Sequence, residues 1–138
     1  MQALLSLHFL MVPLILTAGG LTLIAGITLL ILRRGLSDED TPQTGAVPLF
    51  TRIFRALTWV TAGMGVIQAI FGGLLYLLGG RPAESLHFVY GGIVLLAIPV
   101  AYVYSDQKRV RRDLIIMVIA VVAVIGAAVR ALATGSPS

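Results

Sequence analysis

Two histidines, His8 and His87, are the residues of this sequence best suited to bind a cofactor. Each lies in a Ser-Leu-His-Phe tetrapeptide, and each tetrapeptide opens a long apolar run. Neutral imidazole is a common axial ligand of haem iron. Two helices that each offer one histidine at the same end of a four-helix bundle can therefore hold a haem b, and one such histidine can alternatively ligate the magnesium of a bacteriochlorophyll.

Two neighbours of His87 are candidates to complete such a site. Glu84 lies one helical turn before His87, where its carboxylate can orient the imidazole through the second ring nitrogen. Tyr90 lies about one turn after His87 and is expected to line the same pocket. Glu84 and His87 also have the Glu-x-x-His spacing of carboxylate di-iron bundles. The sequence lacks the second Glu-x-x-His that such a centre requires, which excludes it for a single chain.

The remaining residues offer little catalytic chemistry. The sequence contains no Cys, which excludes disulfides, thiolate metal sites and cysteine nucleophiles. It has neither a glycine-rich phosphate loop nor a nucleophile elbow. Its basic residues lie at the ends of apolar runs rather than in one soluble patch, so nucleic acid is not expected as a partner. The pattern favours a protein without autonomous catalysis.

The composition places both histidines in a lipid bilayer. Of the 138 residues, 58% are hydrophobic and only 12% are charged, whereas a soluble domain carries roughly 25% charged residues. Four apolar runs reach the ~20 residues that a spanning helix needs. We predict an all-α integral membrane protein in which residues 1–138 form one domain, an up-down bundle of four transmembrane helices. The predicted spans are about 9–32, 53–78, 86–104 and 114–133.

The basic residues predict the orientation of the bundle, because cytoplasmic loops of membrane proteins carry an excess of Lys and Arg. Loops 33–52 and 105–113 are therefore predicted to be cytoplasmic, and both termini to lie on the outer side of the inner (cytoplasmic) membrane. Within the first loop, the acidic run Asp38-Glu39-Asp40 is expected to be a solvated turn, with a docking surface for a basic partner as the alternative. Eight of the ten Lys and Arg residues lie in or beside these loops, namely Arg33, Arg34, Arg52, Arg55, Lys108, Arg109, Arg111 and Arg112.

Small residues recur at every fourth position of the second span and predict a packing face. Helices in lipid associate through close contact of small residues rather than through hydrophobicity. This ridge is expected to lie at the centre of the bundle or against another subunit. Gln68, near the middle of the same span, is expected to form an interhelical hydrogen bond rather than to bind a substrate. The ridge consists of Thr61, Gly65, Ala69 and Gly73.

The positions of the two histidines along their spans argue against their pairing. If both helices stand upright, the Cα atoms of His8 and His87 differ in height by about 9 Å, at ~1.5 Å rise per residue. An average tilt of about 20° lowers His8 by only ~2 Å. This difference favours two separate interfacial histidines that contact lipid headgroups or a partner.

The function expected first from the sequence is therefore an accessory or scaffold subunit without a cofactor. Its partners would be other transmembrane subunits or further copies of the chain. The alternative is a haem b- or quinone-binding membrane anchor of an electron-transfer complex that uses His87 and, with it, His8. A third option is a small-solute carrier formed by oligomerisation.

Overall fold

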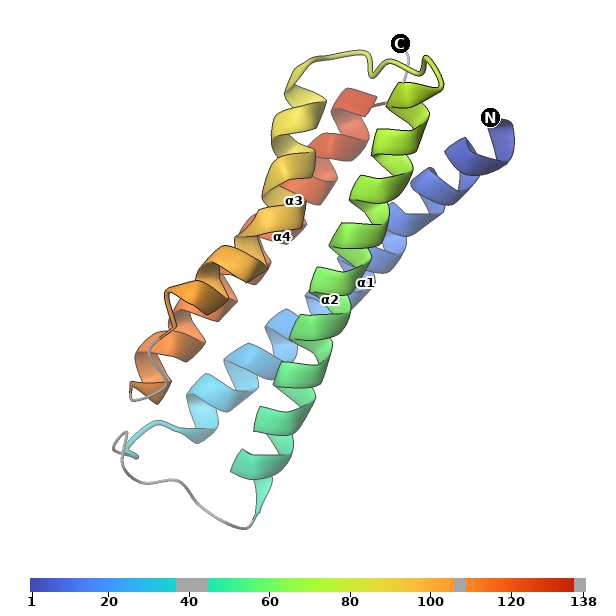
Figure 1. Ribbon diagram of the computed structural model, residues 1–138. Coiled ribbons are helices and arrows are strands. Elements are labelled where there is room, and N and C mark those ends of the chain that lie inside the picture. The colour runs from blue at the N-terminus through green and yellow to red at the C-terminus, as the bar shows by residue number, and fades with distance from the viewer. Residues whose placement is uncertain (37–44, 106–108, 136–138) are drawn as a thin grey trace.

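Helices make up almost all of the described chain, as Figure 1 shows for the computed structural model. The structure describes residues 1–36, 45–105 and 109–135. In these ranges there is no strand, and all four helices are long and apolar enough to cross a membrane, which confirms the predicted all-α class. The helices are α1 (Gln2–Leu32), α2 (Ala46–Leu77), α3 (Leu86–Val103) and α4 (Val110–Gly135).

Three of the helices extend beyond the predicted spans. α1 begins at Gln2 rather than at residue 9, and α4 covers Val110–Gly135 rather than 114–133. α2 begins at Ala46 rather than at residue 53, so residues 46–52 are helical although they were assigned to the 33–52 loop. The predicted start of the second span lies at the charged Arg52, whereas α2 begins directly after Gly45 and includes the mostly apolar residues 46–52.

Glycines with positive φ bracket α2 and define the turn that follows it. Gly45 precedes the helix with φ 94°, and Gly79 follows it with φ 91°. At the carboxyl end, the Gly79 N–H donates to the Tyr76 carbonyl and the Gly80 N–H donates to the Leu75 carbonyl. This pair of bonds is the Schellman arrangement, which satisfies carbonyls that have no partner within the helix. These two hydrogen bonds fix the backbone at the start of the 79–85 turn.

Each helix packs against two neighbours in the order α1, α2, α3, α4, and the contact between α2 and α3 is the least extensive of the four. α1 and α3 therefore lie diagonally across the bundle. Figure 1 shows that neighbouring helices alternate in direction and that α1 crosses obliquely behind α2. The start of α1, the end of α4 and the 79–85 turn lie at one end of the bundle, here called the histidine end.

The interior is filled mainly by aliphatic side chains from all four helices. Val121 and Val124 of α4 are fully buried, and Ile15 and Ile98 are nearly so. Large apolar side chains also face outward on every helix, for example Ile24, which is 63% exposed. Helices that are apolar on both their inner and outer faces are typical of chains surrounded by lipid.

Thr61 and Gly65, the first two residues of the small-residue ridge of α2, face the interior of the bundle, whereas Gly73 is exposed. Thr61 Oγ1 lies 3.1 Å from Thr22 Oγ1 of α1, and both side chains are buried. A Cβ atom added at Gly65 would lie 2.9 Å from the Val94 carbonyl oxygen of α3, so these two backbones approach closely at this glycine. Ala69 and Gly73 continue the ridge into a cavity.

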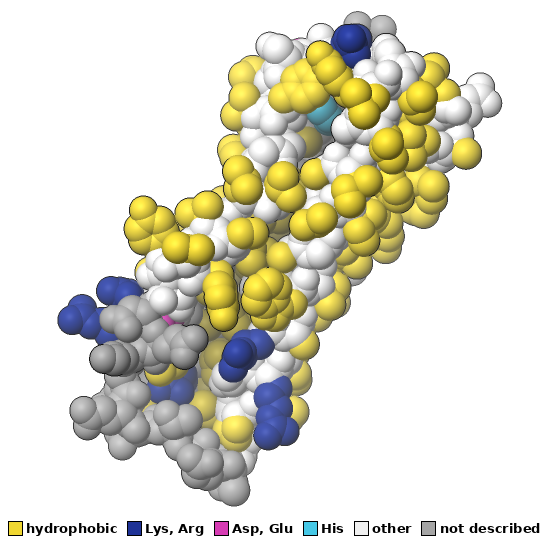
Figure 2. Space-filling view, in the orientation of Figure 1, with side chains coloured by type: hydrophobic (Ala, Val, Ile, Leu, Met, Phe, Trp, Pro, Cys, Tyr) yellow, Lys and Arg dark blue, Asp and Glu magenta, His cyan; other side chains and the backbone are white. Residues whose placement is uncertain are grey.

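Charged residues gather at the end of the bundle opposite the histidine end. Figure 2 shows most of the visible Lys and Arg side chains at this end, here called the basic end, which holds Arg33, Arg34, Arg52 and Arg55. The acidic run Asp38-Glu39-Asp40, for which a solvated turn is predicted, lies outside the described residues.

Candidate functional site

His8 and His87 meet inside a cavity at the histidine end. The centroids of their rings are 6.1 Å apart, and the ring planes are inclined by 52°. The cavity has a volume of about 380 Å³ and is lined by residues of all four helices. In Figure 2 a histidine side chain is visible in a hollow near this end. The sequence-based expectation that a height difference keeps the two histidines apart is therefore wrong.

α1 does not stand upright in the bundle but crosses obliquely behind α2 (Figure 1), so the height difference calculated for upright helices does not apply. α1 also begins at Gln2, so His8 lies in regular helix and not in a frayed end. The cavity thus receives one imidazole from each of two diagonal helices.

His87 is oriented by the backbone of α4. Its Nδ1 lies 3.0 Å from the carbonyl oxygen of Ala131. A carbonyl oxygen only accepts hydrogen bonds, so Nδ1 carries the proton and Nε2 keeps its lone pair for a ligand. The ring also lies against Gly135, where an added Cβ would be 2.8 Å from the His87 Cε1. The absence of a side chain at Gly135 makes room for this ring position.

His8 is paired with Gln68 of α2. The Nε2 atoms of the two side chains are 3.3 Å apart, so the interhelical hydrogen bond expected of Gln68 is made to a histidine. His8 Nδ1 and Gln68 Oε1 are buried and have no hydrogen-bond partner among the described residues. An unsatisfied buried polar group costs about 1–3 kcal/mol. A ligand that bonded to either atom would recover part of this free energy.

Glu84 and Tyr90 do not surround His87 in the predicted way. The Ala131 carbonyl, and not the Glu84 carboxylate, holds the His87 Nδ1. Glu84 is exposed, and its backbone N–H donates to the Thr134 carbonyl of α4. Tyr90 packs against the aliphatic core and lies under Arg130, whose guanidinium carbon is 5.7 Å from the ring centroid. Tyr90 is therefore outside the lining of the cavity.

Small residues flank the histidine pair on the other two helices. The lining includes residues of the ridge on α2 and a matching set on α4, and the histidines come from α1 and α3. The sequence patterns did not single out Gly72, Ala128 or Gly135, although Gln68 and Gly72, like Ala131 and Gly135, are four residues apart and hence on one helix face. The small residues of the lining are Ala69, Gly72 and Gly73 on α2, Gly80 in the turn, Gly91 and Gly92 on α3, and Ala128, Ala131 and Gly135 on α4.

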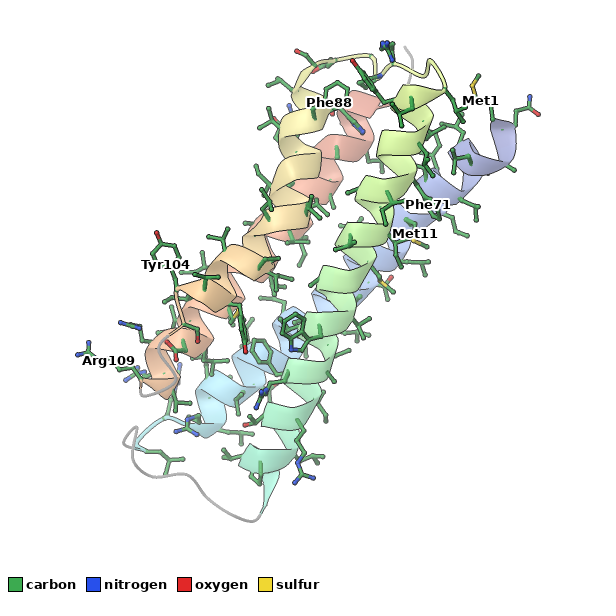
Figure 3. All side chains as sticks on the ribbon, in the orientation of Figure 1. Met1, Met11, Phe71, Phe88, Tyr104 and Arg109 are labelled. Atoms are coloured by element: carbon green, nitrogen blue, oxygen red, sulfur yellow. The ribbon has the colours of Figure 1, made fainter. Side chains whose placement is uncertain are left out.

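Aromatic side chains border the cavity between α2 and α3, the two helices in least contact. The rings of Tyr76 on α2 and Phe88 on α3 are 5.5 Å apart in an edge-to-face arrangement, and both side chains line the cavity. Phe88 is labelled in Figure 3, at the histidine end of α3. The site thus combines two imidazoles and one amide with largely apolar walls, which suits a mainly apolar ligand that contains a metal ion or a few polar atoms.

In comparisons with known proteins, the chain matches no family model, no curated protein and no solved structure.

Proposed function

We propose that the chain binds one haem b between His8 and His87 and acts as a membrane subunit of an electron-transfer complex. The observation that carries this proposal is the placement of two imidazoles from diagonal helices with their centroids 6.1 Å apart inside a mainly apolar cavity. Two axial imidazoles on one metal ion, with metal–nitrogen bonds of ~2 Å, have centroids roughly 6 Å apart.

The small residues beside the histidines leave room for a ligand. Both α2 and α4 contribute Gly and Ala residues to the lining of the cavity. The cavity has a volume of about 380 Å³ and is partly open to the outside. A haem supplies one-electron redox chemistry, and the role of this chain would be to hold it and to exclude water.

The hydrogen bonds of the two histidines differ in whether they leave Nε2 able to bind a metal ion. His87 has its Nδ1 bonded to the Ala131 carbonyl, a type of hydrogen bond that commonly orients metal-ligating histidines. The His8 Nε2 lies next to the Gln68 amide nitrogen. This hydrogen bond must break before the His8 Nε2 can bind a metal ion. His87 is therefore the primary ligand in the proposal.

A quinone is the second candidate ligand. Its head group carries two oxygens that accept hydrogen bonds, or donate them in the quinol form. His8 Nδ1 and Gln68 Oε1, both buried and without partners among the described residues, are a potential donor and a potential acceptor for such oxygens. The apolar lining of the cavity suits the remainder of a quinone equally well.

The test is to express the chain with haem supplied, purify it in a mild detergent and record its absorption spectrum. We expect a Soret band and one haem per chain when the iron porphyrin is quantified. If the purified protein and its native complex lack haem, and added haem does not bind, the haem proposal fails. Quinone in the extracted lipid would then support the second candidate, and stoichiometric partner subunits without any cofactor would support the accessory subunit.

We also propose that the histidine end faces the outside of the inner membrane and that the basic end faces the cytoplasm. The support is the gathering of Arg33, Arg34, Arg52 and Arg55 at one end, with only Arg81 and Arg130 of the described Lys and Arg residues towards the other. This orientation places the cavity near the outer surface and both termini outside.

Cysteine labelling tests this orientation, since the native chain has no Cys. An impermeant thiol reagent applied to intact cells is expected to label Gln2→Cys and Ala83→Cys and to spare Ala46→Cys and Ser105→Cys. After the membrane is permeabilised, Ala46→Cys should also react, which shows that its thiol is accessible. The reverse labelling pattern would refute the orientation.

A further inference from the structure

Arg81 lies in the 79–85 turn and lines the histidine cavity at its rim. Its Nη1 donates hydrogen bonds to the carbonyl oxygens of Tyr76 and Gly80, each at 3.0 Å. Its guanidinium carbon lies 4.1 Å from the centroid of the Tyr76 ring. The charge of Arg81 is therefore held next to the opening bordered by Tyr76 and Phe88.

The turn that carries Arg81 is anchored at both ends. The Gly80 N–H donates to the Leu75 carbonyl at 2.9 Å, and the Glu84 N–H donates to the Thr134 carbonyl at 3.3 Å. A group that is already held in its binding position loses less conformational entropy when a ligand arrives. Both hydrogen bonds of the Arg81 side chain use Nη1, whereas a guanidinium carries N–H donors on all three of its nitrogens.

We propose that Arg81 binds a carboxylate of the ligand in the histidine cavity. This inference rests on the proposed haem site and extends it, because it assigns the ligand an acidic edge at the rim and an apolar body between the helices. Iron protoporphyrin IX has this chemistry, with two propionates on one edge of an apolar ring. A guanidinium pairs with a carboxylate through parallel, charge-assisted hydrogen bonds, which are stronger than neutral ones.

The charges near the rim leave Arg81 available for this role. Glu84, on the same turn, is exposed. Arg130 lies over Tyr90, which is outside the lining of the cavity. Arg81 is thus the cationic side chain that borders the cavity within the described part of the chain.

The experiment compares two porphyrins that differ only in their acidic edge. The purified protein is titrated with iron protoporphyrin IX and with its dimethyl ester, and binding is followed by Soret absorption. We expect the wild-type protein to bind the free acid roughly tenfold more tightly than the ester. Arg81→Gln should lose most of this preference by weakening binding of the acid alone, and Arg81→Lys should keep part of it.

The matched control is Arg34→Gln at the basic end, which should leave both affinities unchanged. Equal binding of acid and ester by the wild-type protein would overturn the role of Arg81 and leave the histidine site intact. An unchanged preference in Arg81→Gln would overturn it as well. If neither porphyrin binds the wild-type protein, the haem proposal itself fails and the role of Arg81 fails with it.

Discussion

Replacement of His87 by alanine is expected to abolish the Soret band of the haem-loaded protein. Because the His87 Nδ1 is bonded to the Ala131 carbonyl, Nε2 is the nitrogen left to bind a metal ion, and alanine offers no atom that can replace it. The measurement is the haem content and absorption spectrum of His87→Ala, purified in the same way as the wild-type protein. Leu86→Ala is the matched control, because Leu86 is the adjacent residue and lies outside the lining of the cavity.

His8→Ala should have a different effect on the spectrum. With His87 in place, loss of the second axial imidazole is expected to leave a weakly bound, high-spin haem with an open axial position. The change also removes the partner of Gln68, so Gln68→Ala serves as a comparison that leaves both imidazoles in place. If haem is retained in low-spin form in either histidine variant, the pair His8 and His87 is not the binding site.

Gly65→Leu is expected to produce the largest loss of stability among single changes in the ridge. A Cβ atom alone would lie 2.9 Å from the Val94 carbonyl oxygen, a backbone atom of α3 that cannot turn away as a side chain can. Overpacking of an interior typically costs about 1–3 kcal/mol. The midpoint of thermal unfolding in detergent should therefore fall clearly below that of the wild-type protein.

The control for this change is Val66→Leu. Val66 is the adjacent residue of α2, and its side chain is 44% exposed on the lipid-facing surface. An added methylene there meets lipid or detergent, and we expect an effect within about 0.5 kcal/mol. Equal destabilisation by the two substitutions would show that close packing at Gly65 has no special importance.

The sequence by itself determined which segments are membrane helices and how they pack locally. Runs of about 20 apolar residues leave a chain no other way to satisfy its backbone in lipid, so length and composition were sufficient to predict four helices. A spacing of four residues places side chains on one helix face, which made the ridge from Thr61 to Gly73 recognisable. The helix ends were harder to predict, because Pro48 and Arg52 make residues 46–52 resemble a loop, although the segment is mostly apolar and forms helix.

The site depended on contacts between segments far apart in the sequence. Whether His8 and His87 meet depends on where α1 and α3 lie in the bundle, and both of these helices are positioned by their packing on α2 and α4. No pattern within the Ser-Leu-His-Phe segments contains that information, so the height estimate for upright helices separated two rings that lie 6.1 Å apart.

The partners of each imidazole were also decided only by the tertiary structure. Glu84 was the natural candidate from sequence because it lies one turn from His87, yet the ring is held by the Ala131 carbonyl of a helix that lies beside it. Every residue has a backbone carbonyl, so the sequence does not reveal which carbonyl will accept the hydrogen bond of a histidine. The choice among them, like the close approach of the His87 ring to Gly135, follows from how α3 packs against α4.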